Sequence, residues 1–143
     1  MSYSIFLDDF RSPKDTASYM PTSMAKLYRD TSWFIVRNFK EFVECVMEHG
    51  PDIGMVSFDH DLDPDHYDNK SHDNGNTGYD CAKWLIHYLS SCDYDMPNLF
   101  LIHSMNLSGS MRIWKLLTNN TNAQVVRIDF GSLDFIKRRN ALP

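Results

Sequence analysis

The chain has 143 residues, of which 43% are hydrophobic and 13% aromatic. This composition favours one folded domain over residues 1–143 rather than a disordered chain. The net charge of −5 argues against an extended nucleic-acid groove. No apolar run approaches the ~20 residues that span a bilayer, and the polar N-terminus does not resemble a signal peptide. Three cysteines without a C-x-x-C pair are typical of free thiols, so we expect a cytoplasmic protein without membrane contacts.

Short runs rich in β-branched and aromatic residues recur along the chain. They predict strands over residues 3–7, 33–36, 55–58, 99–102 and 124–128. Between the first two strands, residues 10–32 contain two prolines and many Ser and Thr. We expect an irregular connection there, with one helical turn around residues 23–28.

Helix signals lie between the later strands. Asn38 with Glu41 three residues on has the form of an N-cap, and a Gly-Pro pair ends the segment that follows. Thr77 and Asp80 form a similar pattern before a run with apolar residues at helical spacing. A further helix is predicted over residues 109–117. The alternation predicts an α/β fold, a single doubly wound domain with a five-stranded, mostly parallel sheet.

Polar side chains follow each predicted strand. In chain order they are Asp8 and Asp9, then Arg37, then Asp59, His60 and Asp61, then His103 and Ser104, and finally Asp129. Because ligands of such sheets bind beyond the carboxyl ends of the strands, we expect these groups to converge on one functional rim.

The acidic members of this rim indicate a cation site. Four carboxylates are involved: Asp8, Asp9, Asp59 and Asp61. Crowded carboxylates repel one another, and a divalent cation relieves that repulsion. Oxygen ligands favour Mg²⁺, Mn²⁺ or Ca²⁺, whereas addition of His60 or His103 shifts the preference towards Mn²⁺, Fe or Zn²⁺.

Two familiar metal motifs do not fit the acidic loop that begins at Asp59. In an EF-hand register the sixth position is Pro64 rather than Gly, and the twelfth is Lys70 rather than Glu. Three histidines recur in it every six residues, a spacing that matches neither a helix face nor a standard zinc pattern.

Four sequence blocks carry a resemblance to a known family. They read F-L-D-D-F-R-S-P at residues 6–13, V-S-F-D-H-D-L at 56–62, T-G-Y-D at 77–80 with W-L at 84–85, and H-S-M-N at 103–106 with Gly109. In this order they resemble the cyclic-phosphate-processing receiver-like domain family, a relative of two-component receivers. The resemblance implies a receiver-like, flavodoxin-like topology. It also implies metal-dependent handling of a nucleotide-type cyclic phosphate, such as a product of RNA or ADP-ribose processing.

The resemblance also assigns roles to individual residues. It places Asp8 and Asp9 as metal-site carboxylates and Asp59 where receivers are phosphorylated. Asp61 belongs to a family block, and Ser104 matches the small hydroxyl residue that receivers keep after the fourth strand.

We interpret the function as metal-dependent phosphoester hydrolysis, with Mg²⁺ or Mn²⁺ held by Asp8 or Asp9 together with Asp59. His60 and His103 are candidate general acids or bases, because imidazole exchanges protons near neutral pH. The candidate substrate-binding residues are Arg11, Ser104, Asn106 and Thr77, of which Thr77 is also the expected helix cap.

Two alternatives stay open. One is a non-catalytic protein that sequesters a nucleotide or cyclic phosphate, and the other is a regulatory module phosphorylated on Asp59. Receivers place a lysine after the fifth strand, whereas here Ile128 and Asp129 follow Arg127, which counts against the second alternative. We expect a small nucleotide-type phosphate as ligand. The oligomeric state and the roles of the long connections 12–32 and 63–76 stay open.

Overall fold

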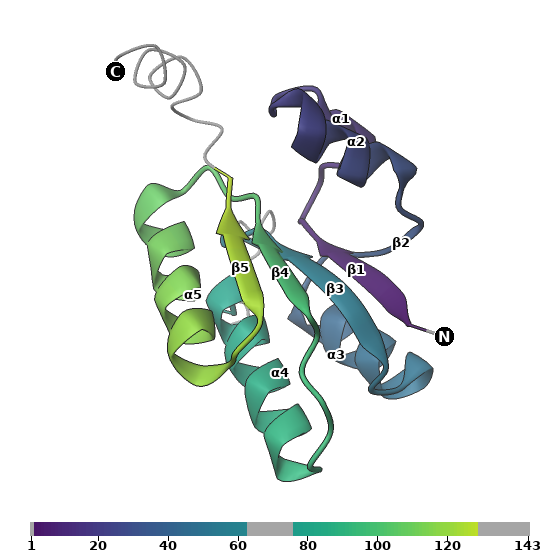
Figure 1. The fold of residues 1–143 in the computed structure, drawn as a ribbon, viewed down its shortest axis with the longest axis vertical. Helices are drawn as coiled ribbons and strands as arrows, with labels where there is room; N and C mark the ends of the chain where they lie inside the picture. Colours follow the sequence, from purple (N-terminus) through teal and green to yellow (C-terminus); the bar gives the residue numbers. More distant parts are fainter. Residues whose placement is uncertain (1, 63–75, 129–143) are drawn as a thin grey trace, which may run out of the picture.

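A computed structural model describes residues 2–62 and 76–128. Its centre is a five-stranded sheet in the order β2-β1-β3-β4-β5, in which every pairing is parallel. The strands are β1 (Tyr3–Leu7), β2 (Trp33–Val36), β3 (Ile53–Phe58), β4 (Leu99–Ile102) and β5 (Gln124–Arg127). The predicted α/β fold with receiver-like topology is confirmed, and the sheet is wholly rather than mostly parallel (Figure 1).

Strand β3 begins at Ile53, two residues before the predicted start. Gly54 hid this extension, because glycine is a poor strand residue. In the structure Ile53 is only 5% exposed, and it pairs with Tyr3. The edge strand β5 ends at Arg127, one residue before the predicted end, although the Ile128 N–H still donates to the carbonyl of Ile102 at 2.7 Å.

The connection from β1 to β2 is more helical than expected: the predicted turn around residues 23–28 is part of a longer helix, and a second helix precedes it. The two helices are α1 (Pro13–Ala17) and α2 (Thr22–Asp30). Ser12 caps α1 in a reciprocal capping box with Asp15, and proline at the first helical position is already in a helical conformation. The short length of α1 and the two prolines concealed the full extent of these helices in the sequence.

Three longer helices connect the remaining strands: α3 (Phe39–His49), α4 (Gly78–Ser91) and α5 (Leu107–Asn120). The predicted caps Asn38 and Thr77 are both present. Helix α5 begins two residues before the predicted start, because the Asn106 side chain accepts a hydrogen bond from the Gly109 N–H at 2.8 Å and caps it.

Apolar side chains cover both faces of the sheet. Helices α3, α4 and α5 pack on one face through fully buried residues such as Phe42, Leu85 and Ile113. The α1–α2 pair packs on the other face against Phe6 and Leu101. Figure 1 shows this pair beside the end of β1 from which the chain leaves the sheet. The pair therefore reaches the same rim as the carboxyl ends of the strands.

Among the described residues, no helix is long and apolar enough to cross a membrane.

Candidate functional site

The carboxyl ends of β1 and β3 bring three carboxylates together. Asp8, Asp9 and Asp59 each offer an oxygen, and these oxygens lie within 4.8 Å of one another. The Asp8 side chain is fully buried, Asp59 is 5% exposed as a residue, and Asp9 is half-buried. Adjacent parallel strands β1 and β3 produce this arrangement, because Leu7 pairs with Phe58 and both chains leave the sheet at the same level.

Two of these carboxyl groups hold their protons more tightly than usual. Burial, with the nearby charge of Asp8, raises the pKa of Asp59 to about 8, although Arg11 opposes the change. The same two causes raise the pKa of Asp9 to about 6. The cluster therefore carries unrelieved repulsion, which a cation reduces.

Asp8 differs from its neighbours because it is surrounded by donors. Its Oδ1 accepts from the backbone N–H groups of Phe10 at 3.0 Å and Arg11 at 2.8 Å. Its Oδ2 accepts from Arg11 Nε at 2.9 Å and from His103 Nε2 at 3.1 Å. Burial alone raises the pKa of Asp8, but the contact with His103 and the two backbone donors outweigh it and lower that pKa. Asp8 is thus the ionised centre of the site.

A buried hydrogen-bonded chain leads away from Asp8. His103 Nδ1 lies 2.6 Å from Ser57 Oγ, which lies 2.5 Å from the hydroxyl of Tyr28. An ionised carboxylate only accepts, so His103 Nε2 carries the proton, Nδ1 accepts from Ser57, and Ser57 accepts from Tyr28. Burial lowers the pKa of His103 against the effect of Asp8, consistent with a neutral ring. The imidazole also stacks on Phe6 at 4.5 Å.

The second histidine, His60, supports a different carboxylate. Its Nδ1 lies 2.8 Å from Asp61 Oδ1, which also accepts from Asn106 Nδ2 at 3.1 Å. The ring packs against α5, where a Cβ added at Gly109 would lie 2.4 Å from Cγ of His60. A Cβ at Gly78 would lie 1.8 Å from the Asp59 carbonyl oxygen. Both glycines are therefore required by close approach rather than by backbone conformation.

Two arginines organise the loop after β1. Arg37 Nη1 donates to the carbonyls of Asp8 at 3.1 Å and Arg11 at 2.6 Å, which fixes the path of the loop. Arg11 itself lies between carboxylates, with its Nη2 3.7 Å from Asp59 Oδ1. Its guanidinium also lies 5.8 Å from the ring centre of Phe10. The positive charge of Arg11 is thus held where the acidic group meets the solvent.

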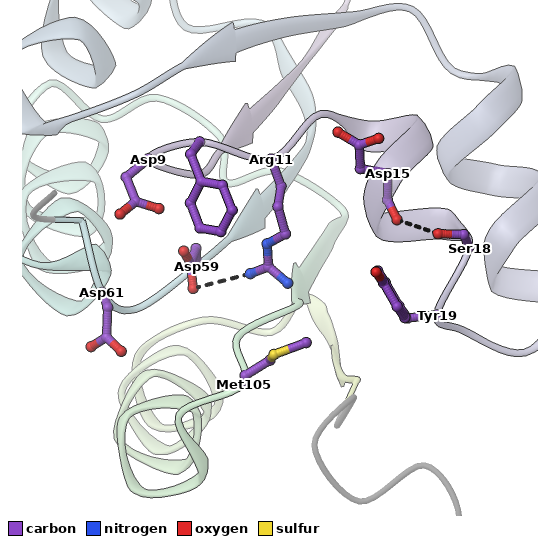
Figure 2. Close-up of a pocket in the computed structure, with 9 residues that line it drawn as sticks. Asp9, Arg11, Asp15, Ser18, Tyr19, Asp59, Asp61 and Met105 are labelled. Atoms are coloured by element: carbon purple, nitrogen blue, oxygen red, sulfur yellow. Dashed lines mark hydrogen bonds and ion pairs between the residues drawn. The ribbon is translucent and has the colours of Figure 1, made fainter.

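A pocket of about 540 Å³ opens over the carboxylates. Its lining consists of Asp9, Phe10, Arg11, Asp15, Ser18, Tyr19, Asp59, Asp61 and Met105. Figure 2 shows Asp9, Asp59 and Asp61 on one side, Asp15, Ser18 and Tyr19 on the other, and Arg11 between them. The pocket is large enough for a small organic ligand.

The predicted site residues fall into two groups. Four of them line the pocket: Arg11, Asp9, Asp59 and Asp61. Asp61 is 65% exposed at its side chain and lies outside the group of three close carboxylates, whereas Asp8 belongs to that group but is fully buried and does not line the pocket. The others are not part of the pocket lining: His60, His103, Ser104, Asn106 and Thr77.

The residues behind the pocket have identifiable partners. Ser104 Oγ accepts from the Asn106 backbone N–H at 3.0 Å, and Thr77 caps α4 together with Asp80. The remaining rim residue, Asp129, and the loop histidines His66 and His72 lie outside the described residues.

Sequence reasoning missed several residues of the site. Tyr28 and Ser57 belong to the buried chain, and Tyr19 and Met105 line the pocket. A polar Ser57 within an otherwise apolar strand was a signal of a buried hydrogen bond. No comparable signal distinguished Tyr19 or Tyr28, because both lie in the connection whose helices were only partly recognised.

Comparison with known proteins identifies the family to which the chain belongs. A family described as the cyclic-phosphate processing receiver domain matches residues 3–119. No curated protein and no solved structure gave a match. The match covers every described strand except β5, and it includes all three clustered carboxylates together with Arg11 and His103. The chain therefore belongs to the cyclic-phosphate-processing receiver domain family, and it is a receiver-like domain linked to cyclic-phosphate processing.

Proposed function

We propose that this protein is a metal-dependent phosphoesterase that opens a cyclic phosphate of a nucleotide-type substrate. The observation that carries the proposal is the close group of Asp8, Asp9 and Asp59 beneath a pocket that also contains Arg11. Family membership supports the cyclic phosphate as the reacting group. The reaction adds water across one P–O bond of the ring, and the released oxygen takes a proton.

The carboxylate group is suited to Mg²⁺ or Mn²⁺. Both cations prefer oxygen ligands. Asp9 and Asp59 line the pocket, and their raised pKa values mean that their ionisation is unfavourable in the absence of a cation, which a bound cation reverses. Asp8, which is fully buried, is the third carboxylate of the group. When bound there, the cation supplies Lewis-acid stabilisation of the phosphate and a more acidic water molecule.

The chain's own residues orient the substrate and move protons. Arg11, held by Asp8, presents its guanidinium at the pocket, where it is positioned to pair with a phosphate oxygen. A pocket-lining carboxylate takes the proton of the attacking water. The histidines act through the carboxylates that they contact: His60 through Asp61 and His103 through Asp8.

The proposal is tested by ³¹P NMR of the purified protein with a panel of cyclic phosphates, with and without Mn²⁺ or Mg²⁺. The panel contains 2′,3′-cyclic and 3′,5′-cyclic nucleotides and an ADP-ribose cyclic phosphate. We expect a ring-opened product that requires the metal and is lost in Asp59→Asn. The matched control is Asp95→Asn, an exposed carboxylate that precedes β4 and so lies at the opposite end of the sheet.

Each other outcome selects an alternative. Line broadening without product indicates a protein that sequesters the ligand and does not hydrolyse it. Labelling of Asp59 by acetyl phosphate, with no response to cyclic phosphates, indicates a receiver-like regulatory module. Unchanged spectra with the whole panel contradict the proposal.

A further inference from the structure

The pocket extends well beyond the carboxylates. Its far side is built by α1 and the turn that follows it, through Asp15, Ser18 and Tyr19. Met105, after β4, lies along the lower edge of the pocket in Figure 2, between the two sides. A volume of about 540 Å³ exceeds what a phosphate group with its cation needs. The pocket therefore has room for a second part of the ligand.

Three large apolar side chains that solvent reaches line the pocket. Phe10 is 72% exposed, Tyr19 51% and Met105 49%. A single exposed apolar residue is ordinary, but three around one pocket mark a surface that a ligand can cover. Figure 2 shows Tyr19 reaching towards Arg11 from the side opposite Asp9.

Tyr19 is held in place by its neighbours although its ring is exposed. Ala17 and Met20, on either side of it, are 2% and 9% exposed and belong to the cluster that packs on the sheet. The Tyr19 N–H donates to the carbonyl of Thr16 at 3.1 Å. The backbone that carries the ring is fixed in this way, so only the side-chain torsions of Tyr19 lose freedom when a ligand stacks on the ring.

The two regions differ in chemistry. The carboxylates and Arg11 suit a phosphate with its cation, whereas Tyr19, Phe10 and Met105 suit a flat apolar group. We infer that Tyr19, with Phe10 and Met105, forms a stacking subsite for the nucleobase of the ligand. The phosphate half of this assignment rests on the proposed function, whereas the stacking half rests on the aromatic side chains alone.

The test compares two ligands that share one cyclic phosphate. These are 2′,3′-cyclic AMP and 1-O-methylribose 2′,3′-cyclic phosphate, in which a methoxy group replaces the base. Apparent affinity is measured in excess Mg²⁺, as KM where turnover occurs and as Kd from NMR titration where it does not. Adenosine is examined separately by saturation-transfer NMR, because it carries the base without the phosphate.

The wild-type protein is expected to prefer the base-bearing ligand by ~10-fold, as for one stacked base. Tyr19→Ala brings this ratio towards one, whereas Tyr19→Phe keeps it, because the ring rather than the hydroxyl is needed. The matched control is Tyr94→Ala, which removes an exposed tyrosine that is not part of the pocket lining.

The outcomes separate this inference from the proposed function. Equal affinity for both cyclic phosphates in the wild-type protein, with turnover, overturns the stacking subsite and leaves the phosphoesterase. Saturation transfer to adenosine that depends on the Tyr19 ring, without ring opening of any cyclic phosphate, supports the subsite and contradicts the phosphoesterase. Absence of binding by all three compounds overturns both.

Discussion

At the scale of single residues, His103 shows how burial restricts the role of an ionisable group. Its ring is fully buried, it stacks on Phe6, and both of its nitrogens have partners. The neutral ring donates to Asp8 and accepts from Ser57. In the structure His103 orients the Asp8 carboxylate, and its role as a general acid or base stays a prediction. The sequence identified His103 correctly as a member of the rim, but it did not indicate its depth.

The chain Tyr28–Ser57–His103 predicts a stability effect far from the pocket. Tyr28→Phe leaves Ser57 Oγ without its donor in a fully buried place, so we expect the free energy of unfolding to fall by ~1–3 kcal/mol. Urea denaturation measures it, with the exposed Tyr94→Phe as control, for which the change stays within ~0.5 kcal/mol. Equal effects of the two substitutions contradict a buried chain. In ¹⁵N spectra of the wild-type protein, His103 is expected to carry its proton on Nε2.

At the scale of elements, the start of α5 positions the residues behind the pocket. Asn106 caps the helix through Oδ1 and donates to Asp61 through Nδ2, so a single side chain links α5 to the loop after β3. Gly109 in the first turn allows the ring of His60 to lie against the helix. Helix α5 is therefore part of the site, although none of its residues lines the pocket.

This packing predicts that Gly109 does not tolerate a side chain. A Cβ there would lie 2.4 Å from Cγ of His60, so Gly109→Ala must displace the ring or the helix. We expect a loss of ~1–3 kcal/mol in the free energy of unfolding, although alanine favours helix formation. Thermal or urea denaturation tests this against Lys115→Ala, an exposed position of the same helix. A Gly109→Ala protein as stable as the control shows that the helix does not press on His60.

At the scale of the whole molecule, the carboxylate group couples the stability of the fold to pH. An unfolded aspartate releases its proton near pH 4, whereas the folded protein keeps one on Asp59 up to about pH 8. The folded state therefore binds more protons between these values, and the metal-free protein loses stability as the pH rises through this range. His103 acts in the opposite direction, because burial lowers its pKa and favours the folded state as the pH rises.

The contribution of Asp59 is isolated by comparing the wild-type protein with Asp59→Asn. In the presence of a chelator, which keeps both proteins free of metal, we expect the free energy of unfolding of the wild type to fall more steeply from pH 4 to pH 8 than that of the variant. Excess Mn²⁺ should reduce this loss in the wild type alone, because a bound cation stabilises the ionised carboxylates. Urea denaturation across pH measures both effects. Parallel pH profiles, in the presence or absence of Mn²⁺, refute the role of Asp59.

The fold was largely predictable because its signals are local. Five β-favouring runs and three helices, two of them with recognisable caps, are patterns within short windows, and alternation of these elements specifies a parallel sheet. The positions of Asp8 and Asp59 directly after strands then follow from the topology. Of the α1–α2 pair only one turn around residues 23–28 was predicted, because two short helices with prolines and many polar residues give only a weak periodic signal.

The sequence by itself determined the sheet, the edge at which its strands end and the acidic residues that lie there. Only the tertiary structure decided which side chains face the pocket. His103 contacts Asp8 across 95 residues of chain, and Ser57 contacts Tyr28 across 29. Such contacts depend on how separate elements pack together, which no local pattern contains. For the same reason, the place of Tyr19 in the pocket depended on the docking of α1 and α2 against the sheet.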